Sequence, residues 1–187
     1  MKILLIDNYD SFTYNIVDLL KQLNIDDVTI LKNDEITIEE ASHFDKIIIS
    51  PGPATPKESG NILSIIQSLG ATHSILGICL GHQAIAEAYG GQLINLENPY
   101  HGYITQLMDI KPHRIFDHIQ STEVGLYHSW IVDAESLPTD LEISSYSSDG
   151  YIMSIKHKTH DVHGVQFHPE SYMTPDGKKM IENFFNG

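Results

Sequence analysis

The only cysteine of the chain lies in a segment whose residues could perform nucleophilic chemistry. Cys79 stands in the run Gly77-Ile78-Cys79-Leu80-Gly81, after a short apolar stretch and before a segment with helical spacing. This pattern is typical of a nucleophile elbow, in which a strand turns sharply into a helix and presents one side chain above the sheet. A Cβ in place of either glycine would clash within so tight a turn. Cys79 is therefore a candidate nucleophile.

The predicted position of Cys79 also favours its reactive form. A cysteine at a helix N-terminus lies at the positive end of the helix dipole, which stabilises thiolate over thiol. The backbone amide of Leu80 would point to where an oxyanion forms. A free thiol is only slightly ionised at neutral pH, so a base is still required. The alternative interpretation is a small buried residue at the end of a core strand, where lone cysteines often lie.

A histidine and a glutamate near the end of the chain could supply this base. His168 and Glu170 belong to the run Gly164-Val165-Gln166-Phe167-His168-Pro169-Glu170-Ser171, which we expect to be extended. Residues two apart in a strand share a face, so the two side chains would project together. A carboxylate can then hold the imidazole in one tautomer while its other nitrogen meets a thiol. Pro169 fixes φ between them. Together with the elbow, the pair predicts a Cys-His-Glu triad.

The elements that must position these residues alternate between strand and helix in the first half of the chain. This alternation predicts an open, mainly parallel sheet in a flavodoxin-like, three-layer α/β fold with helices on both faces. Ligands of such sheets bind at the carboxyl ends of the strands, where the Asp7–Ser11 turn, the Pro51–Pro56 loop and the elbow all fall. We expect Ser11 or its neighbours to cap the first helix. The expected strands are Lys2–Ile6, Val28–Leu31, Lys46–Ser50 and Ser74–Ile78, and the expected helical segments are Phe12–Leu23, Thr37–Ala41, Asn61–Leu69 and His82–Tyr89.

The second half of the sequence is typical of short strands with close turns. Ser148-Asp149-Gly150 indicates a hairpin turn, and Pro175–Phe185 is expected to form a terminal helix. No repeat, linker or low-complexity tract occurs, so we expect a single domain over residues 1–187. The expected strands are Ile104–Ile110, Thr122–Tyr127, Leu141–Tyr146, Tyr151–His157 and Val162–Phe167.

Composition narrows the classes of protein to consider. The net charge of −14 argues against a nucleic-acid partner, because phosphate binding needs a basic surface. No apolar run reaches the length of a membrane span, and Asp7 comes too early for a signal peptide. One cysteine excludes an internal disulfide and fits a reducing, cytoplasmic location. The glycine-rich patterns of nucleotide-binding loops are absent from the sequence.

Five motifs occur in order along the chain: Ser50–Pro53, the elbow, His101-Gly102, Tyr127–Ser129 and Gly164–Ser171. Together they resemble the motifs of the class I (triad) glutamine amidotransferases. The opening Asp7–Asn15 is similar to the small subunit (component II) of anthranilate synthase and of its relative aminodeoxychorismate (para-aminobenzoate) synthase. The resemblance covers nearly the whole chain and implies the same fold.

The resemblance implies a glutaminase mechanism. Cys79 would attack the side-chain amide of glutamine, His168 would transfer the protons, and Glu170 would orient His168. Ammonia would then pass to chorismate on a separate, larger subunit. The resemblance implies no cofactor in this chain and Mg²⁺ in the partner. The backbone amides of the oxyanion hole would come from Gly52 and Leu80, and the glutamine contacts from Gly52, Pro53, Ala54, Gln83, Ser129 and Trp130.

Three positions depart from the pattern of the family. Many relatives have glycine or cysteine at Ala54, leucine at Trp130, and a lysine at Tyr103. Alanine at position 54 is tolerable if this residue contacts glutamine only through its backbone. The other two bear on the shape of the substrate pocket and on contacts with the partner. All three positions of the triad match.

Other functions stay open on the sequence alone. Anthranilate synthase is favoured, with aminodeoxychorismate synthase or a component shared by both as alternatives. A free-standing cysteine γ-glutamyl hydrolase would use the same elbow without a partner. A non-catalytic, flavodoxin-like binding module would leave the triad residues as a coincidence.

The remaining histidines and aromatic residues receive simpler interpretations. The spacing of His157, His160 and His163 suits a metal site poorly, so solvated histidines are preferred. His101 and His128 are expected to position loops near the pocket. The aromatic residues Tyr9, Phe12 and Tyr14 are expected to serve packing or an interface rather than cofactor binding.

Overall fold

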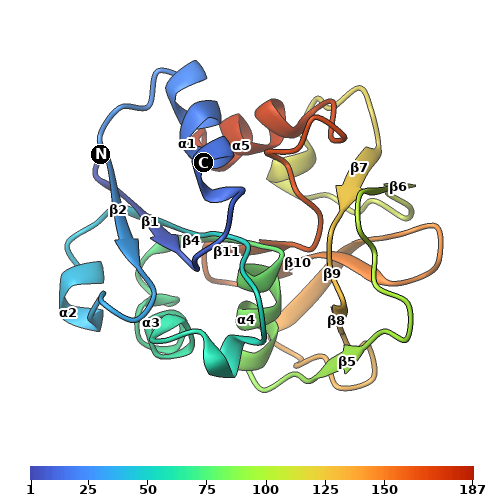
Figure 1. The fold of residues 1–187 in the computed structure, drawn as a ribbon, viewed down its shortest axis with the longest axis horizontal. Coiled ribbons are helices and arrows are strands. Elements are labelled where there is room, and N and C mark those ends of the chain that lie inside the picture. The colour runs from blue at the N-terminus through green and yellow to red at the C-terminus, as the bar shows by residue number, and fades with distance from the viewer.

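The computed structural model describes residues 1–187 and is built around a seven-stranded sheet (Figure 1). The strand order is β2-β1-β3-β4-β11-β10-β9. The first five strands in this order are mutually parallel, whereas β10 is antiparallel to both of its neighbours. The mainly parallel α/β architecture predicted from the sequence is confirmed. The strands are β1 (Ile3–Asp7), β2 (Val28–Lys32), β3 (Lys46–Ile49), β4 (Ser74–Ile78), β9 (Leu141–Tyr146), β10 (Ile152–His157) and β11 (Val162–Val165).

Helices cover both faces of this sheet and create two apolar cores. In Figure 1, α1 (Thr13–Gln22) and α5 (Gly177–Phe185) lie above the sheet, and α2 (Ile38–Ala41), α3 (Ile62–Leu69) and α4 (Leu80–Ala88) lie below it. The central strands are buried on both faces, which explains their continuous apolar sequences. No helix combines the length and the apolar character that crossing a bilayer requires.

Two small antiparallel sheets extend the fold beside the main one. One pairs β5 (Leu93–Asn95) with β8 (Trp130–Val132), and the other pairs β6 (Tyr103–Gln106) with β7 (Glu123–Leu126). Strands β5 and β8 were not predicted from the sequence, because three residues are too few to show a period. Short 3₁₀ helices occur at Pro56–Glu58 and Arg114–Phe116.

Several predicted boundaries need correction. The strand expected at Ile104–Ile110 ends at Gln106, and Asp109 has a φ of 50°, which a strand cannot accommodate. Helix α4 begins at Leu80 rather than His82, because the elbow turns directly into it. The last strand ends at Val165 rather than Phe167.

The start of α1 also differs from the expectation. Ser11 does not cap the helix, whose N-cap residue is Phe12 without a side-chain cap. The side chain of Asp10 instead accepts a hydrogen bond from Phe12 N over 2.8 Å. Asp7, expected in the turn, ends β1 and is buried, where it is paired with Lys32 and accepts from Thr13 Oγ1. The turn is thus tied to the end of β1.

Candidate active site

Cys79 occupies the sharp turn between β4 and α4. Its backbone has φ 52° and ψ −100°, a conformation that residues other than glycine rarely adopt. A Cβ at Gly77 would come within 2.3 Å of Gly81 O, and one at Gly81 within 2.6 Å of Ile49 O. The steric reason given for both glycines is therefore confirmed. Cys79 N donates to Val165 O over 2.8 Å, which ties the elbow to the end of β11.

Leu80 and Gly52, to which the resemblance assigns the oxyanion hole, both lie at the elbow. The amide of Leu80 belongs to the first turn of α4, where N–H groups have no partner within the helix. Gly52 lies against Leu80: a Cβ on Gly52 would come within 2.6 Å of Leu80 Cδ2 and 2.5 Å of Asn8 Cβ. Only glycine therefore fits the position from which this loop approaches the elbow.

His168 and Glu170 form the hydrogen-bonded pair that the sequence predicted, but not for the predicted reason. They lie in a turn after β11, not in an extended strand, and Ser171 N closes this turn by donating to His168 O over 3.1 Å. His168 Nδ1 and Glu170 Oε1 are 2.7 Å apart and both side chains are buried. Because Nδ1 is occupied, Nε2 is the nitrogen left to exchange a proton with a thiol.

The surroundings of His168 favour its protonated form. Burial by itself lowers the pKa, but the charge of Glu170 and the neighbouring sulfur of Cys79 outweigh it and raise the pKa of His168 to about 10. An imidazolium at neutral pH is the natural counter-ion of a thiolate. Cys79 and His168 can therefore form a thiolate–imidazolium pair, in which the thiolate is the nucleophile and the imidazolium is the proton donor.

Two aromatic rings pack against the His168 imidazole and against each other. Phe12 and Tyr127 each have ring centroids 5.0 Å from His168 in edge-on geometry. Tyr127 OH lies 3.2 Å from Ser171 Oγ in the turn that follows Glu170. The prediction that Phe12 serves packing is confirmed, and the imidazole it packs against is His168. Tyr9 and Tyr14, by contrast, are exposed.

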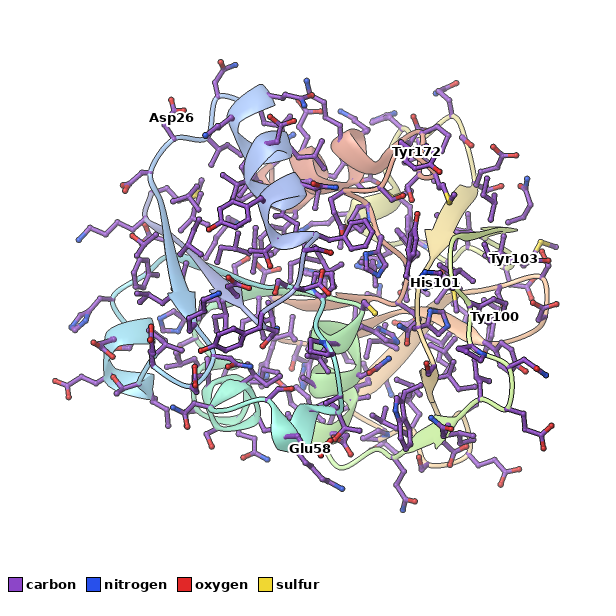
Figure 2. The ribbon with its side chains drawn as sticks, in the orientation of Figure 1. Asp26, Glu58, Tyr100, His101, Tyr103 and Tyr172 are labelled. Carbon is purple, nitrogen blue, oxygen red and sulfur yellow. The ribbon has the colours of Figure 1, made fainter.

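A cavity of about 560 Å³ opens above Cys79. Most of the predicted substrate residues line this cavity: Gly52, Pro53, Ala54, Gln83, Ser129 and Trp130. Part of its wall was not predicted from the sequence, namely Asp10, Pro99, Tyr100 and Tyr127, whereas His101 and His128 were expected only near it. Figure 2 shows Tyr100, His101 and Tyr103 close together on the side of the molecule that carries β6 and β7. The loop before β6 gave no periodic signal that could have revealed Pro99 and Tyr100.

Gln83 has one polar atom left for a ligand. Its Nε2 donates to Trp130 O over 2.8 Å and to Gln166 Oε1 over 3.2 Å, so both amide protons are used. Its Oε1 accepts no hydrogen bond from the protein, and Gln83 lines the cavity. The atom of Gln83 available to a substrate is therefore a hydrogen-bond acceptor.

The three residues that depart from the family pattern lie in or beside the cavity. Ala54 has a φ of 65°, so glycine would fit this backbone with less strain. Trp130 is half-buried at the start of β8, and its carbonyl holds Gln83. Tyr103 is 50% exposed and its ring packs at a tilt against that of Tyr100, so it contributes to the surface beside the cavity.

The interpretation of the histidines as solvated is wrong for two of them. His163 is buried and bonds Asp161 Oδ1 and His113 over 2.7 Å each. His157 is also buried and stacks on His160 with centroids 3.9 Å apart. No group of three or more histidine, cysteine, aspartate or glutamate side chains is arranged to hold a metal ion.

His128 lies buried in the cavity wall beside Ser129. Burial, reinforced by the neighbouring His168 and His82, lowers the pKa of His128 to about 3, so this imidazole is neutral at physiological pH. Its ring packs on Tyr100 with centroids 5.2 Å apart.

Comparison with known proteins agrees with the fold and the motifs. A family model described as "Glutamine amidotransferase class-I" matches residues 4–187. Anthranilate synthase component 2 of Cyanophora paradoxa is 44% identical, over 98% of both chains. Aminodeoxychorismate/anthranilate synthase component 2 of Bacillus subtilis is 42% identical over 97% of this chain and 94% of that protein.

Two further matches concern a longer protein and a solved structure. The chain spans 32% of the bifunctional protein TrpGD of Thermotoga maritima, to which it is 41% identical. The crystal structure of a Thermoplasma acidophilum protein, described provisionally as a component of GMP synthase, superposes with a TM-score of 0.85 at 27% identity. This superposition covers 100% of the present chain and 92% of the other.

The fold and the elbow thus define an α/β protein with a cysteine at a strand-to-helix turn. With the family match over nearly its whole length, the chain belongs to the class I glutamine amidotransferases.

Proposed function

We propose that this chain is the glutaminase subunit of a chorismate-using synthase, with anthranilate synthase as the favoured complex. The observation that carries the proposal is the strained Cys79 elbow beside the buried pair His168 and Glu170, whose nitrogen and oxygen are 2.7 Å apart. This arrangement fits nucleophilic attack on a side-chain amide.

The first half of the reaction releases ammonia. The thiolate of Cys79 attacks the γ-carbonyl carbon of glutamine, and the amides of Gly52 and Leu80 donate to the oxyanion. Removing one such donor typically costs about 100- to 1000-fold in rate. The proton on His168 Nε2 passes to the leaving nitrogen, the C–N bond breaks, and a γ-glutamyl thioester remains on Cys79.

The second half regenerates the enzyme. His168, now neutral, removes a proton from water, and the resulting hydroxide attacks the thioester carbonyl. The C–S bond breaks and glutamate leaves, so Cys79 and His168 return to the thiolate and imidazolium. Glu170 keeps the imidazole in a single orientation through both halves, because its hydrogen bond to Nδ1 persists.

Substrate recognition involves the cavity above the elbow. Gln83 Oε1 offers an acceptor, and the loop Gly52–Ala54 and the Ser129-Trp130 backbone face the same space. The amide group of glutamine carries both donors and an acceptor, which matches such a lining.

The partner is a larger synthase subunit that receives ammonia and adds it to chorismate. Relatives of similar identity are named after anthranilate synthase, after aminodeoxychorismate synthase or after both, and the anthranilate synthase components among them support the favoured choice. No step above uses a cofactor of this chain, and Mg²⁺ is proposed for the partner. We expect partner binding with chorismate to stimulate glutamine hydrolysis, because an uncoupled glutaminase would waste glutamine.

An assay of glutamate release tests the proposal. Purified chain is assayed alone and with each candidate synthase subunit plus chorismate, with Cys79→Ser as the blank. Stimulation by only the anthranilate synthase partner supports the favoured complex, and stimulation by both partners indicates a shared component. High activity unchanged by either partner would favour a free-standing hydrolase and refute the proposal.

A further inference from the structure

A glutamine that follows β11 contacts the sulfur of Cys79 and has no part in the mechanism described above. Gln166 comes directly after Val165 and is completely buried (0% exposed). Its Nε2 donates a hydrogen bond to Cys79 Sγ over 3.6 Å. Burying an amide is costly unless its polar atoms are paired, so the pairing of this one is informative.

The neighbouring hydrogen bonds determine which end of the Gln166 amide faces the sulfur. The backbone carbonyl of Trp130 can only accept, so Gln83 must turn its nitrogen toward it. The second proton of Gln83 Nε2 then goes to Gln166 Oε1 over 3.2 Å. Because Oε1 is turned toward Gln83, the NH₂ group of Gln166 is left facing Cys79. The backbone carbonyl of Trp130 thus sets the donor-to-acceptor direction of every hydrogen bond between it and the sulfur.

A donor in this position acts on the charge of the nucleophile. A thiolate is a stronger acceptor than a thiol, so an N–H donor stabilises the ionised form preferentially. We infer that Gln166 is a further catalytic residue, whose Nε2–H stabilises the thiolate of Cys79 and holds the sulfur in its attacking position.

The main chain fixes the donor and the nucleophile to each other. Gln166 N donates to Met153 O over 2.8 Å, and Val165 O accepts from Cys79 N over 2.8 Å. The sulfur and the amide therefore keep their spacing without relying on a flexible loop. Because the N–H dipole of Gln166 is fixed before the reaction begins, it stabilises the charge on the Cys79 sulfur without a cost of reorientation.

The same hydrogen-bond chain ends in the substrate cavity. Gln83 lines that cavity, where glutamine is proposed to bind, and its Oε1 accepts no hydrogen bond from the protein. A substrate donor on Gln83 Oε1 would polarise the chain that ends on the sulfur. This last link rests on the proposed function, whereas the effect of Gln166 on thiol ionisation does not.

Alkylation of Cys79 by iodoacetamide tests the inference. Cys79 is the only cysteine, so the rate of alkylation, followed across the pH range in which thiols ionise, reports this one group. In Gln166→Met, which keeps the length of the side chain and removes the donor, the midpoint of the profile should move to higher pH. Alkylation at neutral pH should slow about 10-fold. For glutamine hydrolysis, kcat should fall by a similar factor with little change in KM.

A matched control separates this effect from the loss of any buried hydrogen bond. Ser154→Ala breaks the buried hydrogen bond of 2.7 Å between Ser145 on β9 and Ser154 on β10, and it should leave the alkylation profile unchanged. A folded Gln166→Met variant with the wild-type profile would overturn the inference. If Gln166→Met does not fold, Gln166→Leu decides by the same readout. If that variant also fails, Gln83→Met decides, because it removes the donor that orients Gln166. A shifted alkylation profile without glutaminase activity in the wild type would uphold the role of Gln166 and reject the proposed function.

Discussion

Glu170→Gln should remove most of the catalytic activity while preserving the shape of the site. Glu170 is buried and its Oε1 lies 2.7 Å from His168 Nδ1, so solvent screens the pair little. The substitution removes the charge that opposes the effect of burial on His168, so the pKa of His168 should fall from about 10. Without that charge, the imidazolium that accompanies the Cys79 thiolate becomes unfavourable.

The expected magnitude follows from the role of the lost charge. Where a buried carboxylate orients a catalytic histidine, its amide substitution typically lowers kcat about 10⁴-fold, because the amide supports the wrong tautomer. We expect a loss of about 10³- to 10⁴-fold in kcat with little change in KM.

Steady-state glutamine hydrolysis by the stimulated complex measures this loss, and thermal unfolding of the variant checks that it folds. The alkylation rate of Cys79 at neutral pH should fall in parallel, because the thiolate loses its counter-ion. A folded Glu170→Gln variant with kcat within about threefold of the wild type, well short of the effect expected of a triad carboxylate, would refute the reasoning.

Three further perturbations have defined outcomes. Gly81→Ala forces a Cβ to within 2.6 Å of Ile49 O and should lower the free energy of unfolding in urea by about 3 kcal/mol or more. Gly150 has open space around it but a φ of 84°, so Gly150→Ala should cost only about 1 kcal/mol. Equal effects of the two substitutions would contradict the steric argument. Burial lowers the pKa of His82 to about 4 and of His128 to about 3, so below about pH 6.5 the unfolded chain binds protons that the folded chain does not. The free energy of unfolding should therefore fall as pH decreases from about 6.5 to about 4, by up to about 1.4 kcal/mol per pH unit for each histidine, and a flat profile in this window would contradict the assignment. Phe12→Ala removes one edge contact of His168 at 5.0 Å and should lower kcat about 10-fold with a small change in KM; an unchanged kcat would show that Tyr127 alone holds the ring.

The sequence predicted the main sheet because its signal is local and strong. Continuous apolar strands such as Ile3–Asp7 and Lys46–Ile49 are buried on both faces and alternate with helical periods. The elbow could be predicted equally well, because only glycine fits at positions 77 and 81. The three-residue strands β5 and β8 were missed, because their pairing depends on partners far apart in sequence.

The site was predictable where residue type determines chemistry and hidden where it depends on tertiary contact. Cys79, His168 and Glu170 could be chosen from their reactivity and spacing, although the turn that joins the last two differs from the expected strand. The contact of Gln166 with the sulfur was not foreseen, because it depends on Gln83 and Trp130 from other elements. His163 was misjudged for the same reason: its partner His113 lies 50 residues away in the sequence.

The central claim is that Cys79 carries the γ-glutamyl group during turnover. The most direct measurement is the intact mass of the protein, quenched in acid shortly after mixing with glutamine under activating conditions. We predict a mass increase of one γ-glutamyl group that maps to the peptide containing Cys79 and is absent from Cys79→Ser. Release of glutamate without any acylated protein, or acylation that survives in Cys79→Ser, would contradict the account.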